Sequence, residues 1–313
     1  MSNFKKYHEL NYQDNNRHYQ DYSAGALHES IARTWLETDT VDAWRHNRMY
    51  AALDAILESE HATWLTIGDG RFGRDSRYIS GKGGDVIASD IDDTLLKEAR
   101  DIGYISKFSK ENAEMLSFDD DAFDYVLCKE SYHHFPRPMI ALYEMLRVAS
   151  KGVVLIEPND LNISYSVTMN FFAQVISRWL KKINKSIPRH SFEEFGNYVF
   201  TISRRELEKT ALGMNYRYLA LKGINDCYVQ GVEFEKVSDN GKLLRILKLK
   251  IFMRDLLAKL RIIDYGNLAA ILFKQPPSPG LLKQLKRDGF EVVELPENPY
   301  AHGWNTADRG MIT

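Results

Sequence analysis

The chain has 313 residues, 44% of them hydrophobic and 27% charged, as in ordinary soluble globular proteins. Its 41 Lys and Arg nearly balance 43 Asp and Glu, and the net charge of −2 argues against a dedicated nucleic-acid binder. The two cysteines, Cys128 and Cys227, lack metal-ligand spacing, which favours a reduced, cytoplasmic chain without a metal site. No signal peptide is expected, and no run of roughly 18 apolar residues predicts a membrane-spanning helix.

Residues 1–60 predict an N-terminal helical cap, because apolar residues recur at helical spacing between Ala24 and Ser59. From 61 to 160, short apolar runs alternate with helical stretches. The expected strands are residues 63–68, 85–90, 104–109, 122–130 and 152–158. The expected helices are residues 73–80, 93–103 and 137–150, the second closed by Gly103. This alternation predicts a parallel, doubly wound sheet over residues 61–160.

The pattern changes after Pro158. Residues 161–265 predict a lid or substrate region, in which a capping box at Ser203–Glu206 opens a helix. The other elements expected there are a helix at 163–185, a sixth strand at 216–223 and an apolar, basic helix at 242–261. Residues 266–313 add a seventh strand, a helix and at most one further strand to complete the core. The predicted fold is α/β and Rossmann-like: a doubly wound, mostly parallel seven-stranded sheet with N-terminal helices and helical lid insertions.

The stretch WLTIGDGRFGRD at 64–75 places glycines at 68, 70 and 73 between a predicted strand and a predicted helix. Glycine lets a ligand approach the main chain, and the N-terminus of the following helix attracts negative groups. Asp90 ends the next strand, where a carboxylate suits the hydroxyls of a ribose. These features predict a nucleoside cofactor. The alternative is a tight turn with a solvated aspartate.

Residues downstream of this turn favour one nucleoside cofactor over the others. The span from Trp64 to Pro158 contains, in this order, the motifs TIGDGRFG, ASDID, ENAEMLSF, FDYVLCKESYHHF and RVASKGVVLIEP. In the order of these motifs it resembles class I S-adenosylmethionine-dependent methyltransferases of the small-molecule type. The resemblance implies that the cofactor is S-adenosyl-L-methionine.

On the methionine side, the resemblance places Gly68, Asp69 and Gly70 against the methionine and ribose parts of the cofactor. It also implies that the backbone carbonyl of Lys129 accepts from the methionine ammonium. The sequence departs from the family pattern at Thr66, where an acid is usual, and Asp69 is expected to compensate in part.

On the adenosine side, the resemblance implies that Asp90 accepts hydrogen bonds from the ribose hydroxyls and that Ile91 packs on the adenine face. Asn112 and Ala113 would bound the adenine edge, with the Asn112 side chain facing the adenine amino group. An aspartate is common at this position in the family, but an amide oxygen also accepts from an amino group.

The candidate catalytic residues follow from where ligands bind in open α/β sheets, beyond the carboxyl ends of the strands. His133 and His134 follow the fourth predicted strand, and Glu157 ends the fifth. A hydroxyl acceptor needs a general base, an amine needs only to be unprotonated, and a carboxylate needs no base. The alternatives are that one histidine only packs below the site and that Glu157 only orders the loop.

The acceptor is expected to be an oxygen or nitrogen of a small molecule, and the resemblance favours a sugar, nucleotide-sugar or surface-glycan precursor, as in polysaccharide biosynthesis. A nucleic-acid acceptor is disfavoured, since no Asn-Pro-Pro-Tyr or Pro-Cys motif is present. The apolar, basic helices at 163–185 and 242–261 predict a lid or a homodimer contact, with peripheral membrane contact through 242–261 as the alternative. Alternative functions are an NAD-dependent oxidoreductase and a non-catalytic methyltransferase-like partner protein.

Overall fold

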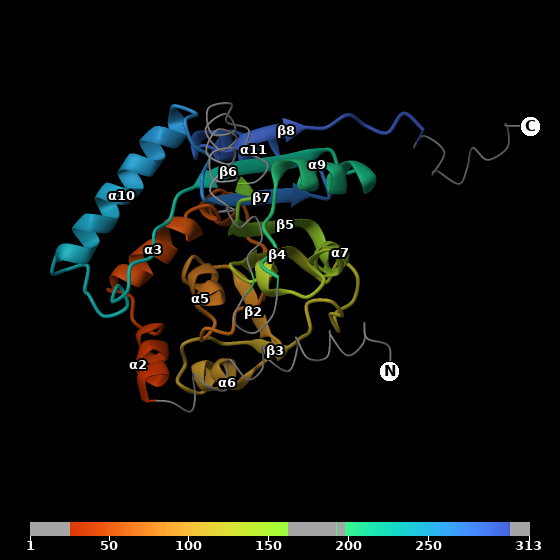
Figure 1. The fold of residues 1–313 in the computed structure, drawn as a ribbon. Helices are drawn as coiled ribbons and strands as arrows, with labels where there is room; N and C mark the ends of the chain where they lie inside the picture. The colour runs from red at the N-terminus through yellow and green to blue at the C-terminus, as the bar shows by residue number, and fades with distance from the viewer. Residues whose placement is uncertain (1–25, 162–191, 193–197, 301–313) are drawn as a thin grey trace, which may run out of the picture.

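The computed structural model describes residues 26–161, 192 and 198–300. Its strands form one eight-stranded sheet in the order β3-β2-β1-β4-β5-β7-β6-β8 (Figure 1). The strands are β1 Thr63–Ile67, β2 Asp85–Asp90, β3 Phe108–Lys110, β4 Phe123–Lys129, β5 Ala149–Pro158, β6 Tyr218–Ile224, β7 Asn267–Phe273 and β8 Glu291–Glu294. Strands β1 to β5 pair in parallel, whereas β7 is antiparallel to β5 and β6, and β8 is antiparallel to β6. The predicted Rossmann-like, mostly parallel sheet is confirmed, with β8 as an eighth strand at its edge.

The helices predicted between residues 61 and 160 are all present, and the N-terminal helical pattern is divided into α2, α3 and α4. The helices are α2 Ala26–Thr34, α3 Val41–Tyr50, α4 Asp54–Ser59, α5 Arg74–Gly81, α6 Thr94–Asp101, α7 Pro138–Val148, α9 Arg204–Gly213, α10 Lys242–Lys259 and α11 Pro279–Arg287, with a 3₁₀ turn, η1, at Tyr132–His134. The helix predicted at 163–185 lies outside the described residues. Among the described residues, no helix is long and apolar enough to cross a bilayer.

Local sequence signals explain two of the helix ends. The Ser203 hydroxyl accepts the Glu206 N–H at 3.2 Å, and the Glu206 carboxylate accepts the Ser203 N–H in return, so the predicted capping box opens α9. Beyond the end of α6, Gly103 adopts a φ of +74°, the left-handed conformation that glycine tolerates best.

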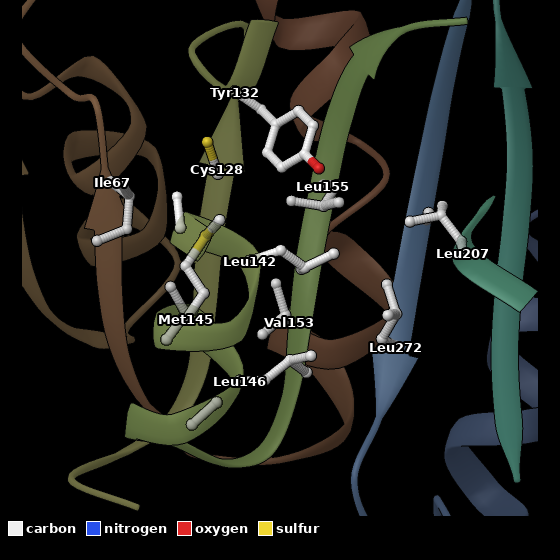
Figure 2. Packing of buried hydrophobic residues seen from close by; sticks show 14 of the residues in the cluster. Ile67, Cys128, Tyr132, Leu142, Met145, Leu146, Val153, Leu155, Leu207 and Leu272 are labelled. Atoms are coloured by element: carbon white, nitrogen blue, oxygen red, sulfur yellow. The ribbon is translucent and has the colours of Figure 1, made fainter. Parts of the chain in front are cut away.

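Two helical layers cover the sheet. One face packs against α7 and α9, and Figure 2 shows part of this cluster, including Met145 and Leu146 of α7 and Val153 and Leu155 of β5. The other face packs against α3, α4, α5 and α11. Strand β5 is apolar on both faces because each is buried, and every fully buried leucine-sized side chain contributes roughly 1.5–3 kcal/mol.

The strand order determines where loops can gather. Chain connections run outward from β1 to β2 and β3, and then return across the sheet to β4. Such a switch point leaves a crevice beyond the carboxyl ends of the neighbouring strands. In this protein the crevice lies between β1 and β4, with the end of β2 on one side and the end of β5 on the other.

Candidate functional site

The turn after β1 is tied directly to the turn after β4. Gly68 has a φ of +75°, and a Cβ built on it would lie only 2.3 Å from the Cβ of Ser131. The Ser131 hydroxyl donates to the Gly68 carbonyl at 2.8 Å. Position 68 therefore admits only glycine, both for its backbone conformation and for its contact with Ser131.

Asp69 organises the glycine turn from within. Its buried carboxylate accepts the N–H groups of Asp75 and Ser76 at 3.0 and 2.9 Å, and the Thr66 hydroxyl at 2.8 Å. These amides belong to the first turn of α5, whose N-cap, Gly73, offers no side-chain acceptor. Burial, and then the neighbouring Asp75, raise the pKa of Asp69. An acid at position 66 would set a second carboxylate against Asp69, whereas Thr66 supplies a hydrogen bond.

A pocket rich in charge lies beyond this turn, where α3 faces β4. It is lined by His46, Tyr50, Gly68, Asp69, Arg71, Arg74, Asp75, Lys129, Glu130, Ser131 and His134, and we call it the charged pocket. The Lys129 ammonium lies 3.1 Å from Glu130 Oε2, 3.5 Å from Asp75 Oδ1 and 4.8 Å from the centre of the Tyr50 ring. Burial opposes its charge, yet Asp75 and Glu130 raise the pKa of Lys129 above its ordinary value.

Glu130 is held in this pocket by an uncommon backbone conformation, with a φ of +51°. Its N–H donates to the Ile156 carbonyl at 2.9 Å, which fixes the turn against β5. Burial alone would raise the pKa of Glu130, but Lys129, Arg71 and Arg45 together lower it to about 2. A strained residue with a strongly perturbed carboxyl in a cleft is typical of functional sites.

His46 contributes a buried imidazole from α3. Burial, and then Lys129, Arg74 and Arg71, lower its pKa well below the ordinary value, so the ring is neutral at physiological pH. Its Nδ1 lies 3.3 Å from Glu130 Oε2 but forms no hydrogen bond within the described part of the chain. A buried polar atom without a partner costs about 1–3 kcal/mol, which a polar ligand group could recover.

The residues predicted for the adenosine side lie beyond the ends of β2 and β3. Asp90 is buried and accepts the Asp92 N–H at 2.9 Å and the Gly70 N–H, and burial raises its pKa to about 7. Ile91 follows it and is half-buried. Asn112 uses its side-chain oxygen within its own turn, accepting the Glu114 N–H at 2.9 Å.

Ala113 lies between Asn112 and Glu114 and packs against the core cluster under α7. A backbone hydrogen bond holds this turn near Asp90, because the Glu111 N–H donates to the Asp90 carbonyl at 2.9 Å. The structure thus brings the four predicted adenosine-side residues to one edge of the sheet.

The three candidate catalytic residues also come together. Glu157 is fully buried at the end of β5, and its Oε1 accepts the N–H groups of Ser131 and Tyr132 at 2.8 and 2.9 Å. Its Oε2 lies 2.7 Å from His133 Nδ1. The ring of His134 is centred 3.9 Å from that of His133 and lines the charged pocket. Glu157 therefore both orders the turn after β4 and orients one histidine.

Sequence reasoning missed several residues of the charged pocket, namely His46, Tyr50, Arg71, Arg74 and Asp75. The spacing of His46 and Tyr50 in the sequence was a signal that could have found them. His46 and Tyr50 lie four residues apart and so share one face of α3, a face that is buried although it carries polar groups. Arg71 and Arg74 lie within and just after the glycine turn, where the motif itself does not specify them.

Comparison with known proteins finds a family model that matches the central part of this chain. Residues 65–156, which run from β1 to β5, match the family model described as a methyltransferase domain. Among curated proteins, none matches this sequence significantly.

Solved structures of similar fold include methyltransferases. The 1,6-didemethyltoxoflavin-N1-methyltransferase of Burkholderia thailandensis, with bound S-adenosylhomocysteine, is 13% identical, with 88% of this chain and 92% of that chain covered and a TM-score of 0.48. A putative methyltransferase of Haloferax volcanii, in complex with the Trm112 activator, is 16% identical, with 76% and 96% covered and a TM-score of 0.43.

Proposed function

We propose that this chain, which carries a class I S-adenosylmethionine-dependent methyltransferase domain, transfers a methyl group to an oxygen or nitrogen of a small-molecule acceptor, with His133 as general base. The 2.7 Å contact between His133 Nδ1 and Glu157 Oε2 carries the proposal. When the ring is neutral, a carboxylate that accepts from Nδ1–H makes Nε2 the acceptor nitrogen. Since a hydroxyl needs such a base and an unprotonated amine does not, the contact favours oxygen over nitrogen.

The charged pocket fits the amino-acid end of S-adenosylmethionine, which carries one carboxylate and one ammonium. Arg71 and Lys129 offer cations to the carboxylate, and Glu130, with its low pKa, offers a carboxylate to the ammonium. His46 Nδ1 is one of three buried side-chain polar atoms without a partner among the described residues, and of these three residues only His46 lines the charged pocket. When bound, the cofactor supplies an electrophilic methyl group on its sulfonium.

The remaining cofactor contacts follow the predicted residues. Gly68 and Gly70 are the proposed contacts of the methionine and ribose parts, and Asp90 offers its carboxylate to the ribose hydroxyls. Ile91, Asn112 and Ala113 are the proposed adenine contacts. Asp69 acts indirectly in this proposal, because its carboxylate is occupied by the amides of α5 and by Thr66.

The chain's own part in the reaction is to position the acceptor and to remove a proton. Glu157 holds the His133 ring, and His133 Nε2 takes the acceptor proton as the methyl group is transferred. His134 lines the charged pocket, and its proposed role is to contact the cofactor or the acceptor there. Helix α3 covers the pocket and restricts water.

We further propose that the acceptor is a sugar, a nucleotide-sugar or a surface-glycan precursor. A polyhydroxylated acceptor presents the hydroxyl groups for which the His133–Glu157 pair is suited, and charged side chains such as Arg71 and Glu130 can hydrogen-bond the remaining ones. A homodimer, a cytoplasmic location and the division into regions 1–60, 61–160, 161–265 and 266–313 belong to the same proposal.

Two measurements test this function separately. Titration calorimetry with S-adenosylhomocysteine and with NAD tests the cofactor, and binding of NAD alone would contradict the proposal. Transfer of labelled methyl groups to a panel of nucleotide-sugars tests the acceptor. In that assay we expect His133→Asn to lower kcat about 10²–10⁴-fold and to remove the fall of kcat toward low pH that protonation of a base causes. His134→Asn, the matched control, should alter KM more than kcat, and equal loss of kcat in both variants would contradict the assignment of His133.

A further inference from the structure

Helix α10 has two apolar faces that point in opposite directions. Its inner face is buried through Leu244, Leu247, Ile251 and Ala258. Its outer face carries a row of large apolar side chains that are 42–63% exposed. We call this row the outer stripe, and it consists of Leu249, Phe252, Met253, Leu256 and Leu260, the last just beyond the helix. In Figure 1, α10 lies along the outside of the molecule beside α3.

The outer stripe is bordered by cations on both sides. At about 100° per residue, Lys250 projects along one edge, and Lys248 and Lys259 along the other, while Arg254 lies behind Lys250, nearer the inner face. The helix also carries Lys242 and Arg245 in its first turns, and its one acid is Asp255. Asp255 is turned inward, where it accepts from the Asn225 side-chain amide at 2.9 Å and lies 3.7 Å from Arg48. Positive charge is therefore concentrated on this helix, although the whole chain has a net charge of −2.

The inner contacts hold α10 in a fixed position. Leu244 and Leu247 pack with Val41 of α3 and with Val232 in one buried cluster. The Arg254 guanidinium donates to the Asp226 carbonyl at 3.0 Å, and the Lys248 ammonium lies 5.9 Å from the centre of the Trp44 ring. The outer stripe is thus presented by a helix that is anchored along its length. It does not need to fold on binding.

We propose that α10 docks this protein on an anionic lipid surface, with the outer stripe in the boundary between headgroups and acyl chains. A helix that lies in a membrane plane carries an apolar face flanked by Lys and Arg. The apolar side chains lose exposure to water on docking, and each cation near an anionic surface adds attraction. A straight apolar row with cations on both edges matches a plane, whereas an acidic protein partner would have to supply both an apolar ridge and two acidic borders.

Helix α3 places this surface close to the charged pocket. Trp44 and Arg48 lie on its face toward α10, whereas His46 and Tyr50 lie on its face toward the pocket. The two pairs are displaced by two residues, or about 200° around the helix, and so occupy opposite sides. The pocket therefore lies about one helix diameter, roughly 10–12 Å, behind the inner face of α10.

Vesicle flotation tests the docking surface without any assay of activity. We expect the full chain to float with vesicles of phosphatidylcholine and phosphatidylglycerol, and to bind vesicles of phosphatidylcholine alone at least tenfold more weakly. The double variant Phe252→Ser/Leu256→Ser should bind the anionic vesicles at least tenfold more weakly than the parent chain. Ile140→Ser/Tyr143→Ser is the matched control, because it removes two exposed apolar side chains from α7 instead. A Phe252→Trp variant should shift its emission to the blue with anionic vesicles.

Three outcomes would overturn the proposal: flotation with neither vesicle, equal loss of binding in the α7 control, or a dimer, seen by light scattering, that the α10 double variant converts to monomer. The last outcome would assign the outer stripe to a second copy of this chain. Calorimetry with S-adenosylhomocysteine on the α10 variant should be unchanged, so loss of docking is distinguishable from loss of the cofactor site.

Discussion

Asp69 and Glu157 are two buried acids that do the same structural work on opposite sides of one crevice. Each accepts two consecutive backbone amides and, as a third partner, a polar side chain, and Glu157 also accepts from the Cys128 thiol at 3.8 Å. Asp69 holds the turn after β1 and the start of α5, and Glu157 holds the turn after β4. The third partner differs. For Asp69 it is the hydroxyl of Thr66, and for Glu157 it is the imidazole of His133.

This difference separates a scaffold from a candidate base. The Thr66 hydroxyl neither gains nor loses a proton near neutral pH, and the Asp69 carboxyl that holds it is turned to the amides of α5, so this group serves the turn. An imidazole in the same position has a second ring nitrogen that faces away from the carboxylate, and it acquires a defined tautomer from its partner. Similar hydrogen-bond patterns can therefore have different functions, and the type of the third residue decides which.

The largest expected effect is that of Glu157→Gln. The glutamine oxygen can still accept the two amides, but its NH₂ group must then face His133 Nδ1. That contact moves the ring proton to Nε2 and abolishes its use as a base, so kcat should fall about 10²–10⁴-fold. Steady-state kinetics checks the effect, and the melting temperature checks that the fold persists.

The control is a double-mutant cycle with His133→Asn. If the two residues act as a pair, the double variant should be no slower than the slower single variant. Additive losses would show that Glu157 and His133 contribute independently.

Asp69→Ala should instead affect stability more than chemistry. It leaves two amides of α5 and the Thr66 hydroxyl without their acceptor, at a cost of about 1–3 kcal/mol. Urea denaturation measures the change in the free energy of unfolding, with Asp69→Asn as the milder variant because one oxygen remains. A loss of kcat as large as that of Glu157→Gln, at unchanged stability, would contradict the comparison.

The pH dependence of stability gives a third contrast. Burial, first, and Asp75 raise the pKa of Asp69, and burial raises the pKa of Asp90 to about 7. Each carboxyl binds its proton more tightly in the folded than in the unfolded chain. Its stabilising effect is complete below the ordinary pKa near 3.8 and is lost as the pH rises through the folded value. The melting temperature should therefore fall between pH 4 and pH 7, to an extent that Asp90→Asn reduces and Asp90→Glu retains.

The smallest expected effect is that of Thr66→Val, which removes the 2.8 Å hydrogen bond to Asp69 and the weak 3.5 Å contact with the Ile87 carbonyl, and costs about 1 kcal/mol. Thr66→Asp should cost more, since it buries a second carboxylate beside Asp69. Thermal unfolding of the two variants checks their order. If Thr66→Asp were more stable than Thr66→Val, Asp69 would tolerate the acid that is usual in the family at position 66. The presence of threonine there would then have no structural explanation.

The sequence predicted the parallel half of the fold well, because β1 to β5 and the helices between them carry strong periodic patterns and glycine or capping signals. The positions of Gly68, Asp90 and Glu157 at strand ends followed from the topology alone. The direction in which each side chain points did not. Asp69 is within the glycine motif, yet its carboxylate turns back to the amides of α5, a choice determined by the unsatisfied helix N-terminus and by Thr66.

Long-range packing was also beyond the sequence. His46 and Tyr50 are separated from Lys129 by some 80 residues, and only the docking of α3 on the turn after β4 brings them together. The eighth strand was weakly indicated because β8 is short, with only Val292 and Val293 between acids, and it depends on its pairing with β6. Exposure of the outer stripe could not be read from periodicity, since α10 is apolar on two faces.

Gly68 shows that a motif glycine can have two separate structural reasons. A glycine at this place in the motif is usually taken to report the approach of a ligand. Here the neighbouring Ser131, 2.3 Å from where a side chain would begin, requires the glycine even without a ligand. Replacing Gly68 by alanine to test cofactor binding would therefore push the turn after β1 away from the turn after β4, whether or not it obstructed the cofactor. Gly68 is therefore best regarded as the contact point between the turns after β1 and β4. Cofactor binding is better tested by substituting the side chains that surround the crevice.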